Sequence, residues 1–195
     1  MRLVIASSNT GKLREIHRLL EPLGVETIPQ QSLGVSDADE PHSSFVENAL
    51  AKARHASRET GLPALADDSG ICVAALNGAP GVLSARFAGE PRSDQRNNDL
   101  LLTRLGDIPR RDAFYYCVIV LLRHQDDPRP VIAEGAWHGE IARFPCGSGG
   151  FGYDPIFSLP ELGKTAAELD RDLKNQLSHR GTALRQLADK LRSAL

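Results

Sequence analysis

The segment from Ala113 to Leu122 constrains the fold of this chain more than any other. Its residues, AFYYCVIVLL, are aromatic, β-branched or aliphatic, which is the composition of a strong β-strand. The turn Asp126-Asp127-Pro128 follows, and Val131 to Trp137 predicts a strand that pairs back as a hairpin partner. Gly139 to Phe144 extends this meander. The later part of the chain therefore contributes antiparallel strands to a sheet.

The first part of the chain alternates strands and helices. Leu3 to Ala6 is a short apolar run, and apolar residues at helical spacing then continue up to Gly24. Residues 25–43 resemble a strand and then a loop. Ser44 to Glu47 fits a capping box, which predicts a helix over residues 44–60. Ala64 to Ala66 predicts a short buried strand.

Two further helices complete the prediction. Ser93 can cap a helix that contains Leu100 to Leu105, and residues 184–191 form a closing amphipathic helix. The chain of 195 residues shows no repeat and no linker. We therefore expect a single α/β domain over residues 1–195, with room for two lobes and with helices packed on a mixed sheet.

Composition excludes several classes of protein. Lys and Arg number 23 against 25 Asp and Glu, for a net charge of −2, whereas long nucleic acid usually requires a strongly basic face. No stretch reaches the roughly 20 apolar residues of a membrane span, and the first residues are too short an apolar run for a signal peptide. The three cysteines form no Cys-x-x-Cys pattern. These features predict a cytoplasmic protein that binds neither membrane nor nucleic-acid polymer.

The first polar cluster with chemical potential follows the opening strand. It resembles a phosphate cradle, because a flexible turn, backbone N–H groups and a lysine meet at the start of a helix. The spacing is not that of a Walker A motif. The alternative is an ordinary strand-to-helix turn with a capping asparagine. The residues are Ser7, Ser8, Asn9, Thr10, Gly11 and Lys12.

The second cluster, Asp67-Asp68-Ser69-Gly70, follows the apolar strand at Ala64. Adjacent strand residues point to opposite faces, so the two aspartates are expected to have different roles. One could reach a metal ion bound with substrate phosphates, as carboxylates do for Mg²⁺. The alternative is an Asx-turn. Glu40 lies in an acidic loop and is a candidate for the second carboxylate that binds the metal ion. The alternative is that this acidic loop is solvated and binds no metal.

The third cluster runs from Gly147 to Asp154. Its glycines permit close approach of the backbone, and Phe151 and Tyr153 stand among them. An aromatic ring held in this way can stack on a nucleobase. The alternative is a tight turn whose aromatic side chains fill the core.

The fourth cluster, Lys174 to Gly181, places cationic and hydrogen-bonding side chains just ahead of the closing helix. An arginine offers a planar fork suited to an oxygen-rich edge, although a lone histidine is more often structural. Lys52 lies four residues after Asn48, so both share one face of their helix. Together the clusters are those required to bind a nucleoside triphosphate with Mg²⁺.

Six sequence blocks, in order along nearly the whole chain, resemble the inosine triphosphate pyrophosphatase family (dITP/XTP pyrophosphatase, Ham1-like). The blocks are Ser7-Ser8-Asn9-Thr10-Gly11-Lys12, Phe45-Val46-Glu47-Asn48-Ala49 with Lys52-Ala53, Ala66-Asp67-Asp68-Ser69-Gly70, Gly78-Ala79-Pro80-Gly81 with Ser84-Ala85-Arg86-Phe87, Gly149-Gly150-Phe151-Gly152-Tyr153-Asp154-Pro155 and Ser178-His179-Arg180-Gly181. No single block is specific, but six in family order are.

The resemblance implies an elongated α/β fold with a mixed sheet flanked by helices, two lobes with a central cleft, and a homodimer. It implies Mg²⁺-dependent hydrolysis of ITP, dITP and XTP to the monophosphate and pyrophosphate, which removes deaminated purine nucleotides from the nucleotide pool. Two functional alternatives remain. They are a Maf-like nucleotide pyrophosphatase of other base specificity, and a non-catalytic nucleotide-binding regulator.

The resemblance also implies roles for individual residues. Asp68 holds Mg²⁺ and accepts a proton, and Glu40 is the second metal ligand. The remaining positions bind substrate, and they are Ser7, Ser8, Asn9, Thr10, Gly11, Lys12, Lys52, Ser69, Phe151, Gly152, Tyr153, Asp154, Lys174, His179 and Arg180. The loop from Asp39 to Ser43 departs from the usual Glu-Glu-Thr-Gly, which leaves open whether Glu40 or Asp39 is the ligand.

Overall fold

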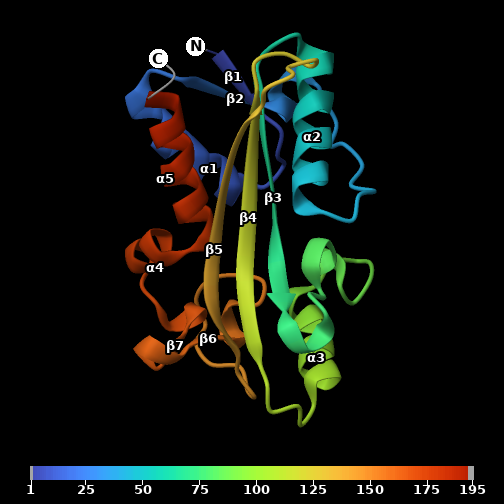
Figure 1. Ribbon diagram of the computed structural model, residues 1–195, viewed down its shortest axis with the longest axis vertical. Coiled ribbons are helices and arrows are strands. Elements are labelled where there is room, and N and C mark those ends of the chain that lie inside the picture. Colours follow the sequence, from blue (N-terminus) through green and yellow to red (C-terminus); the bar gives the residue numbers. More distant parts are fainter. Residues whose placement is uncertain (1, 193–195) are drawn as a thin grey trace. The chain divides into compact units, whose positions relative to one another are not determined.

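The computed structural model describes residues 2–192 and contains one seven-stranded sheet of order β2-β1-β3-β4-β5-β6-β7 (Figure 1). β1 pairs in parallel with β2 and β3, whereas β6 pairs antiparallel with β5 and β7. The predicted mixed sheet is therefore confirmed. The strands are β1 (Arg2–Ile5), β2 (Glu26–Pro29), β3 (Ala64–Val73), β4 (Asp112–Leu122), β5 (Val131–Ile141), β6 (Phe157–Leu159) and β7 (Lys164–Thr165).

The helices begin where the sequence places capping side chains. Asn9, Ser44 and Ser93 each accept hydrogen bonds from backbone N–H groups in the first turn of the helix that follows. The second helix ends at Gly61, whose φ of 66° is left-handed. The helices are α1 (Thr10–Leu20), α2 (Phe45–Thr60), α3 (Asp94–Leu105), α4 (Arg171–Leu177) and α5 (His179–Arg192). Short 3-10 turns lie at Glu21–Leu23, Gln30–Leu33, Ala74–Leu76, Gly81–Arg86, Asp154–Ile156, Pro160–Leu162 and Ala166–Glu168.

Strand β3 corrects one prediction. It does not end at Ala66 but continues to Val73, so Asp67, Asp68 and Ser69 lie inside a strand and not in an Asx-turn. The reason is that Ile71 and Val73, which follow the polar residues in the sequence, are fully buried. Burial of these two apolar side chains stabilises the longer strand.

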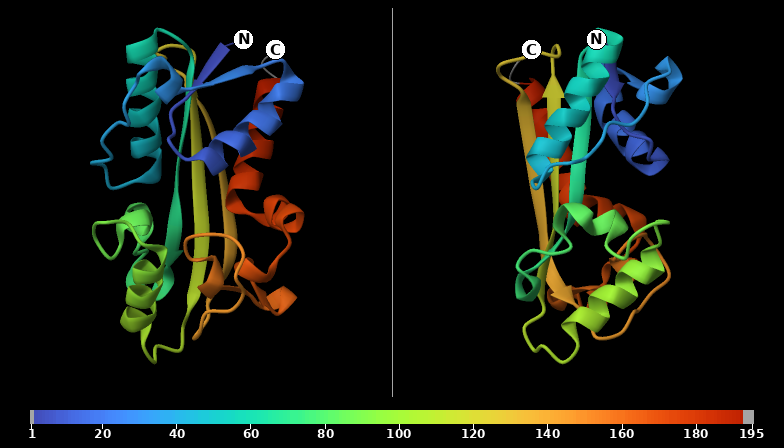
Figure 2. Two further views of the ribbon diagram at one scale, coloured as in Figure 1. Left: turned by 180° about the vertical axis from the view of Figure 1, so that it is seen from behind. Right: turned by 90° about the vertical axis from the view of Figure 1, so that its right-hand side faces the viewer.

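The antiparallel part of the sheet also extends further than predicted. β5 runs without a break to Ile141, and the strand that extends the meander is β6. The arrowheads of β4 and β5 point in opposite directions in Figure 2, as the predicted hairpin requires. At the end of the chain, His179 and Arg180 lie in the first turn of α5 and not ahead of it, and α4 was not predicted.

The chain forms two compact units that divide three strands between them. Unit 1 comprises the described parts of residues 1–68, 117–134 and 182–195, and unit 2 comprises residues 69–116 and 135–181. Each unit has a core of its own. In unit 1, side chains of α1 and α5 pack with those of the strands, as Ile16, Leu65, Ile119 and Leu187 show.

The other helix of unit 1, α2, contacts β1 and lies on the opposite side of the strands from α5 (Figures 1 and 2). In unit 2, the core surrounds Tyr115, Trp137 and Phe157. Within residues 2–192, we find no helix long and apolar enough to cross a membrane.

Candidate active site

The turn before α1 is held by its own side chains. The Asn9 Oδ1 accepts from the backbone N–H groups of Gly11 at 2.9 Å and Lys12 at 3.1 Å, and the Ser7 hydroxyl accepts from the N–H of Asn9. Asn9 is therefore the cap of α1. Two of the backbone N–H groups expected to bind a phosphate, those of Gly11 and Lys12, thus donate to Asn9 instead. Ser8 and Thr10 are exposed to solvent.

The lysine of this turn points at the first aspartate of β3. The Lys12 Nζ lies 2.7 Å from the Asp67 Oδ2, and the two side chains are 18% and 2% exposed. A buried carboxylate is stable only with a partner of this kind. Asp67 therefore fixes the ammonium group of Lys12.

The second aspartate has a different partner, as the alternation along β3 predicts. The Lys52 Nζ donates to the Glu40 Oε1 at 2.6 Å and to the Asp68 Oδ1 at 3.4 Å. Lys52 thus links the acidic loop to β3. We call Lys12, Glu40, Lys52, Asp67 and Asp68 the carboxylate–lysine cluster.

Asn48 fixes the geometry of this cluster from α2. Its side chain is buried, accepts from the N–H of His42 at 3.0 Å and donates to the carbonyl of the same residue at 3.2 Å. It also donates to the Asp68 Oδ2 at 3.4 Å. The shared helix face of Asn48 and Lys52 therefore meets one carboxylate, as their spacing predicts.

Burial and charge act against each other at Asp68. Burial raises the pKa of its carboxyl, Lys52 opposes this, and the negative charge of Glu40 raises the pKa further, with a net shift upward. Burial alone lowers the pKa of Lys52, but the carboxylates of Asp68, Asp67 and Glu40 outweigh it and raise that pKa. Lys52 is therefore a cation, and burial is the main reason that the pKa of the Asp68 carboxyl is raised.

Three carboxylates against two lysines make the cluster a candidate site for a divalent cation. Glu40 and Asp68 both lie within reach of one ammonium group, and carboxylate oxygens are the ligands that Mg²⁺ prefers. Asp39 is exposed to solvent, whereas Glu40 is partly buried in the cluster. The residues present thus fit a metal held by Glu40 and Asp68, together with oxygens from a ligand.

Unit 2 brings together the remaining charged candidates. The Asp154 carboxylate is buried and forms an ion pair with Lys174, and it accepts from the backbone N–H of Phe151 at 2.7 Å. We call Phe151, Asp154, Lys174, His179 and Arg180 the aromatic–cation cluster. Ser69 joins it because its hydroxyl lies 3.4 Å from the Arg180 Nη2.

The Phe151 ring is the exposed face of this cluster. It is 57% exposed, which excludes the alternative that it fills the core. The Lys174 Nζ lies 4.7 Å from the ring centroid and the Arg180 guanidinium carbon lies 5.9 Å from it. The ring and two cations thus offer a surface for a flat, electron-rich ligand.

The other aromatic residue of the loop has a structural role. Tyr153 is buried and donates from its hydroxyl to the carbonyl of Ser84 at 2.8 Å, so the core alternative is correct for this side chain. Gly150, at φ 76°, has to be glycine, because a Cβ there would lie 2.1 Å from the Asp154 Oδ2. Gly150 therefore serves close packing within unit 2.

Sequence reasoning missed several residues that hold the loop. The N–H of Gly152 donates to the Asp94 carboxylate at 2.7 Å, and the Asn98 side chain donates to the carbonyl of Gly152 at 3.1 Å. Tyr115 stacks on His179, with ring centroids 4.8 Å apart. A tyrosine in a strong strand and polar residues on a helix carry no signal of such contacts in a single sequence.

The fold and the two clusters define a class of protein. It is an α/β protein with a carboxylate–lysine cluster suited to phosphates and a metal ion. It also has an exposed aromatic ring, with two cations over it, that is suited to a base.

The chain belongs to the Ham1 family, whose model matches residues 3–190. The predicted family is therefore confirmed. A protein of Nitrosomonas europaea named dITP/XTP pyrophosphatase is 67% identical over 97% of this chain and 94% of its own length. One of the same name from Aromatoleum aromaticum is 63% identical over 99% of this chain and 98% of its own. A solved HAM1 protein from Coxiella burnetii superposes with a TM-score of 0.96 at 51% identity over 99% of both chains.

Proposed function

We propose that this chain hydrolyses dITP, ITP and XTP to the corresponding monophosphate and pyrophosphate. The relatives described above carry the names of dITP/XTP pyrophosphatases. The structural observation that carries the proposal is Lys52, whose ammonium group joins Glu40 and Asp68 in one cluster. This arrangement places positive charge for phosphates beside carboxylates for a metal ion and a water molecule.

The proposal assigns the phosphates to unit 1. Lys12 and Lys52 neutralise phosphate oxygens, and the exposed hydroxyls of Ser8 and Thr10 donate to them. Asp68 orients a water molecule against the α-phosphorus and accepts its proton. The new bond joins the water oxygen to that phosphorus, and the bond to the bridging oxygen breaks, so the β- and γ-phosphates leave as pyrophosphate.

We further propose that the metal is Mg²⁺, held by Glu40 and Asp68. When bound, Mg²⁺ supplies charge neutralisation on the phosphates and on the leaving pyrophosphate.

The proposal assigns the base to unit 2. Phe151, which has Lys174 and Arg180 over its ring, stacks on the purine ring. In this proposal, Lys174, His179 and Arg180 contact the edge of the base. A 6-oxo purine accepts from such donors, whereas the 6-amino group of adenine presents a donor to them. Rejection of GTP, which also has a 6-oxo group, requires discrimination at the 2-position.

A substrate panel tests the function. The purified protein is incubated with ITP, XTP, GTP or ATP, with Mg²⁺ or with EDTA, and pyrophosphate and orthophosphate are assayed separately. We expect pyrophosphate from ITP and XTP, with kcat/KM at least about 100-fold above that for ATP, and none with EDTA. Release of orthophosphate would contradict the placement of the attacking water. Binding without turnover would indicate a nucleotide-binding regulator.

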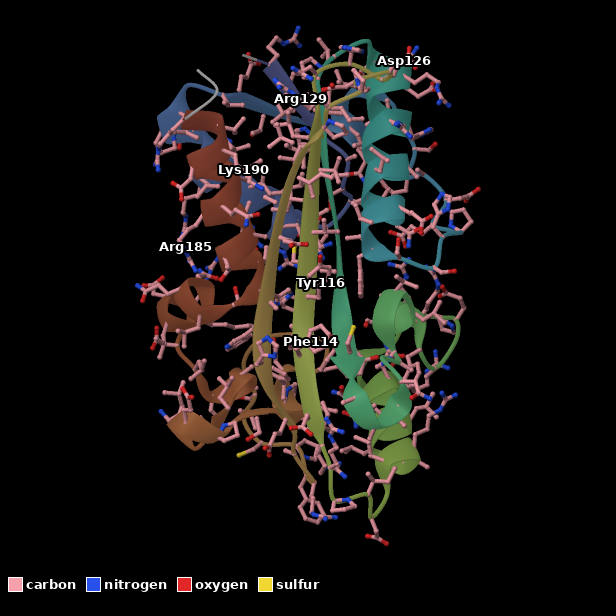
Figure 3. The ribbon with its side chains drawn as sticks, in the orientation of Figure 1. Phe114, Tyr116, Asp126, Arg129, Arg185 and Lys190 are labelled. Carbon is pink, nitrogen blue, oxygen red and sulfur yellow. The ribbon has the colours of Figure 1, made fainter. Side chains whose placement is uncertain are left out.

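We also propose that the protein is cytoplasmic, since deaminated nucleotides arise in the cytoplasmic nucleotide pool. We further propose that it is a homodimer. An aromatic pair on the face of β4 and β5 opposite to Tyr115 supports the dimer. The rings of Phe114 and His138 lie 5.6 Å apart, His138 is exposed, and Phe114 is labelled on β4 in Figure 3. Light scattering after size-exclusion chromatography is expected to give twice the chain mass for the wild type. Phe114→Glu is expected to give the monomer mass.

A further inference from the structure

Tyr115 is a buried residue of β4 that contacts two members of the aromatic–cation cluster. Its side chain is 8% exposed. The hydroxyl lies 3.4 Å from the Asp154 Oδ1, and the ring is stacked on the imidazole of His179. One core side chain thus contacts His179, which was assigned above to the base, and Asp154, which holds Phe151 and Lys174.

The hydroxyl completes the hydrogen bonding of Asp154. The Oδ2 of that carboxylate takes the N–H of Phe151 and the ammonium of Lys174, whereas the Oδ1 faces Tyr115. Burial, and then the charge of Asp154, raise the pKa of the Tyr115 phenol well above its ordinary value, so the hydroxyl keeps its proton and donates. The orientation of the carboxylate that anchors both Phe151 and Lys174 thus depends on Tyr115.

The ring of Tyr115 sets the plane of His179. The two rings are almost parallel, with an interplanar angle of 7° and centroids 4.8 Å apart. On its other sides Tyr115 meets Phe157 edge-on at 4.7 Å and Trp137 at 6.4 Å. Because these neighbours belong to the core of unit 2, the tyrosine ring has little freedom to rotate, and it transfers that rigidity to the imidazole.

We propose that Tyr115 is a positioning residue for base discrimination, which orients His179 through its ring and Asp154 through its hydroxyl. The discrimination part rests on the function proposed above. Two substitutions separate the two contacts. Tyr115→Phe keeps the ring and removes the hydroxyl, and Tyr115→Leu keeps an apolar core residue and removes the stack as well.

Steady-state kinetics with ITP and GTP measure the consequence. We expect Tyr115→Phe to raise KM for ITP about 3- to 10-fold and to leave kcat within about twofold, because the loss concerns substrate orientation. We expect Tyr115→Leu to lower the ratio of kcat/KM for ITP to that for GTP about 10-fold. Tyr116→Phe removes a hydroxyl from the next residue of β4, whose side chain points to the other face of the strand, and is expected to change neither value more than about twofold.

A second readout does not depend on turnover. In a histidine-labelled sample, the ring protons of His179 are identified with the variant His179→Gln. Stacking on Tyr115 is expected to shift these protons upfield in the wild type and in Tyr115→Phe, and the shift is expected to vanish in Tyr115→Leu. The melting temperature of each variant shows whether it is folded.

The outcomes are distinct. Unchanged His179 signals in folded Tyr115→Leu, or unchanged KM and base ratio in both variants of an active enzyme, would overturn the positioning role. A loss of activity that follows the folded fraction, with KM and base ratio constant, would also overturn it and leave a structural role. If the wild type releases no pyrophosphate while the His179 signals respond as expected, the proposed function fails and the orientation of His179 by Tyr115 stands.

Discussion

Asp68→Asn is expected to abolish pyrophosphate release from ITP, with a fall in kcat of about 1,000-fold or more. The substitution removes the carboxylate that accepts the proton of the attacking water, and a positioned base contributes about 10²- to 10⁴-fold to a rate. It also removes one of the two carboxylates that fit a metal ion. Asn retains an oxygen for the ammonium of Lys52, which lies 3.4 Å from Asp68.

The fold is expected to tolerate this substitution. Because burial is the largest cause of the raised pKa of Asp68, the folded state disfavours the ionised carboxyl relative to the unfolded chain. A neutral side chain of the same shape is therefore not expected to destabilise the protein. A melting temperature within a few degrees of the wild type confirms that the loss of rate is chemical.

Asp39→Asn is the matched control for the loss of a carboxylate from the same part of unit 1. Asp39 is exposed, whereas Glu40 contacts Lys52 at 2.6 Å. We expect Asp39→Asn to retain at least about half of the wild-type rate. A large loss in that variant would instead assign the second metal ligand to Asp39. Appreciable turnover by folded Asp68→Asn would show that another group accepts the proton.

Much of the fold could be predicted from local patterns. Ser44 and Gly61 mark the two ends of α2, and the apolar composition of β4 identifies it as a strand, because caps and burial act within a few residues. The extent of β3 could not be predicted. Asp67, Asp68 and Ser69 interrupt its apolar pattern, and their partners come from distant segments such as α1 and α2.

The same limit applies to the candidate site. The sequence indicates which side chains carry charge, but the pairings of Lys12 with Asp67 and of Lys174 with Asp154 depend on tertiary structure. Asn9 shows the converse. Its role as the cap of α1 is local, and it was the simpler of two interpretations of the same turn. Local chemistry was thus predictable, whereas long-range partners were not.

Lys12→Met is expected to lower both activity and stability, and the two effects can be separated. Loss of the ammonium group removes a phosphate contact, which we expect to reduce kcat/KM for ITP about 100-fold or more. It also takes the ammonium partner from Asp67, whose side chain is 2% exposed. Removal of one partner of a buried ion pair costs about 3 to 5 kcal/mol in the free energy of unfolding.

The double variant Lys12→Met with Asp67→Asn separates binding from folding. It replaces the buried charge by a neutral amide, so we expect the free energy of unfolding to return to within about 1.5 kcal/mol of the wild type. Activity is expected to stay as low as in Lys12→Met, because the phosphate contact is still missing. Asp67→Asn alone keeps the lysine without its anchor, and we expect a fall in kcat/KM of about 10-fold.

Urea denaturation of the four proteins gives the stabilities, and pyrophosphate release gives the rates. If stability recovers in the double variant and the rate does not, Lys12 binds phosphate and Asp67 anchors it, as proposed. Recovery of the rate together with the stability would mean that Lys12 only neutralises Asp67 and does not bind phosphate. If stability does not recover, the loss of stability in Lys12→Met arises from the lost packing of the lysine stem. It then does not arise from the unpaired charge of buried Asp67.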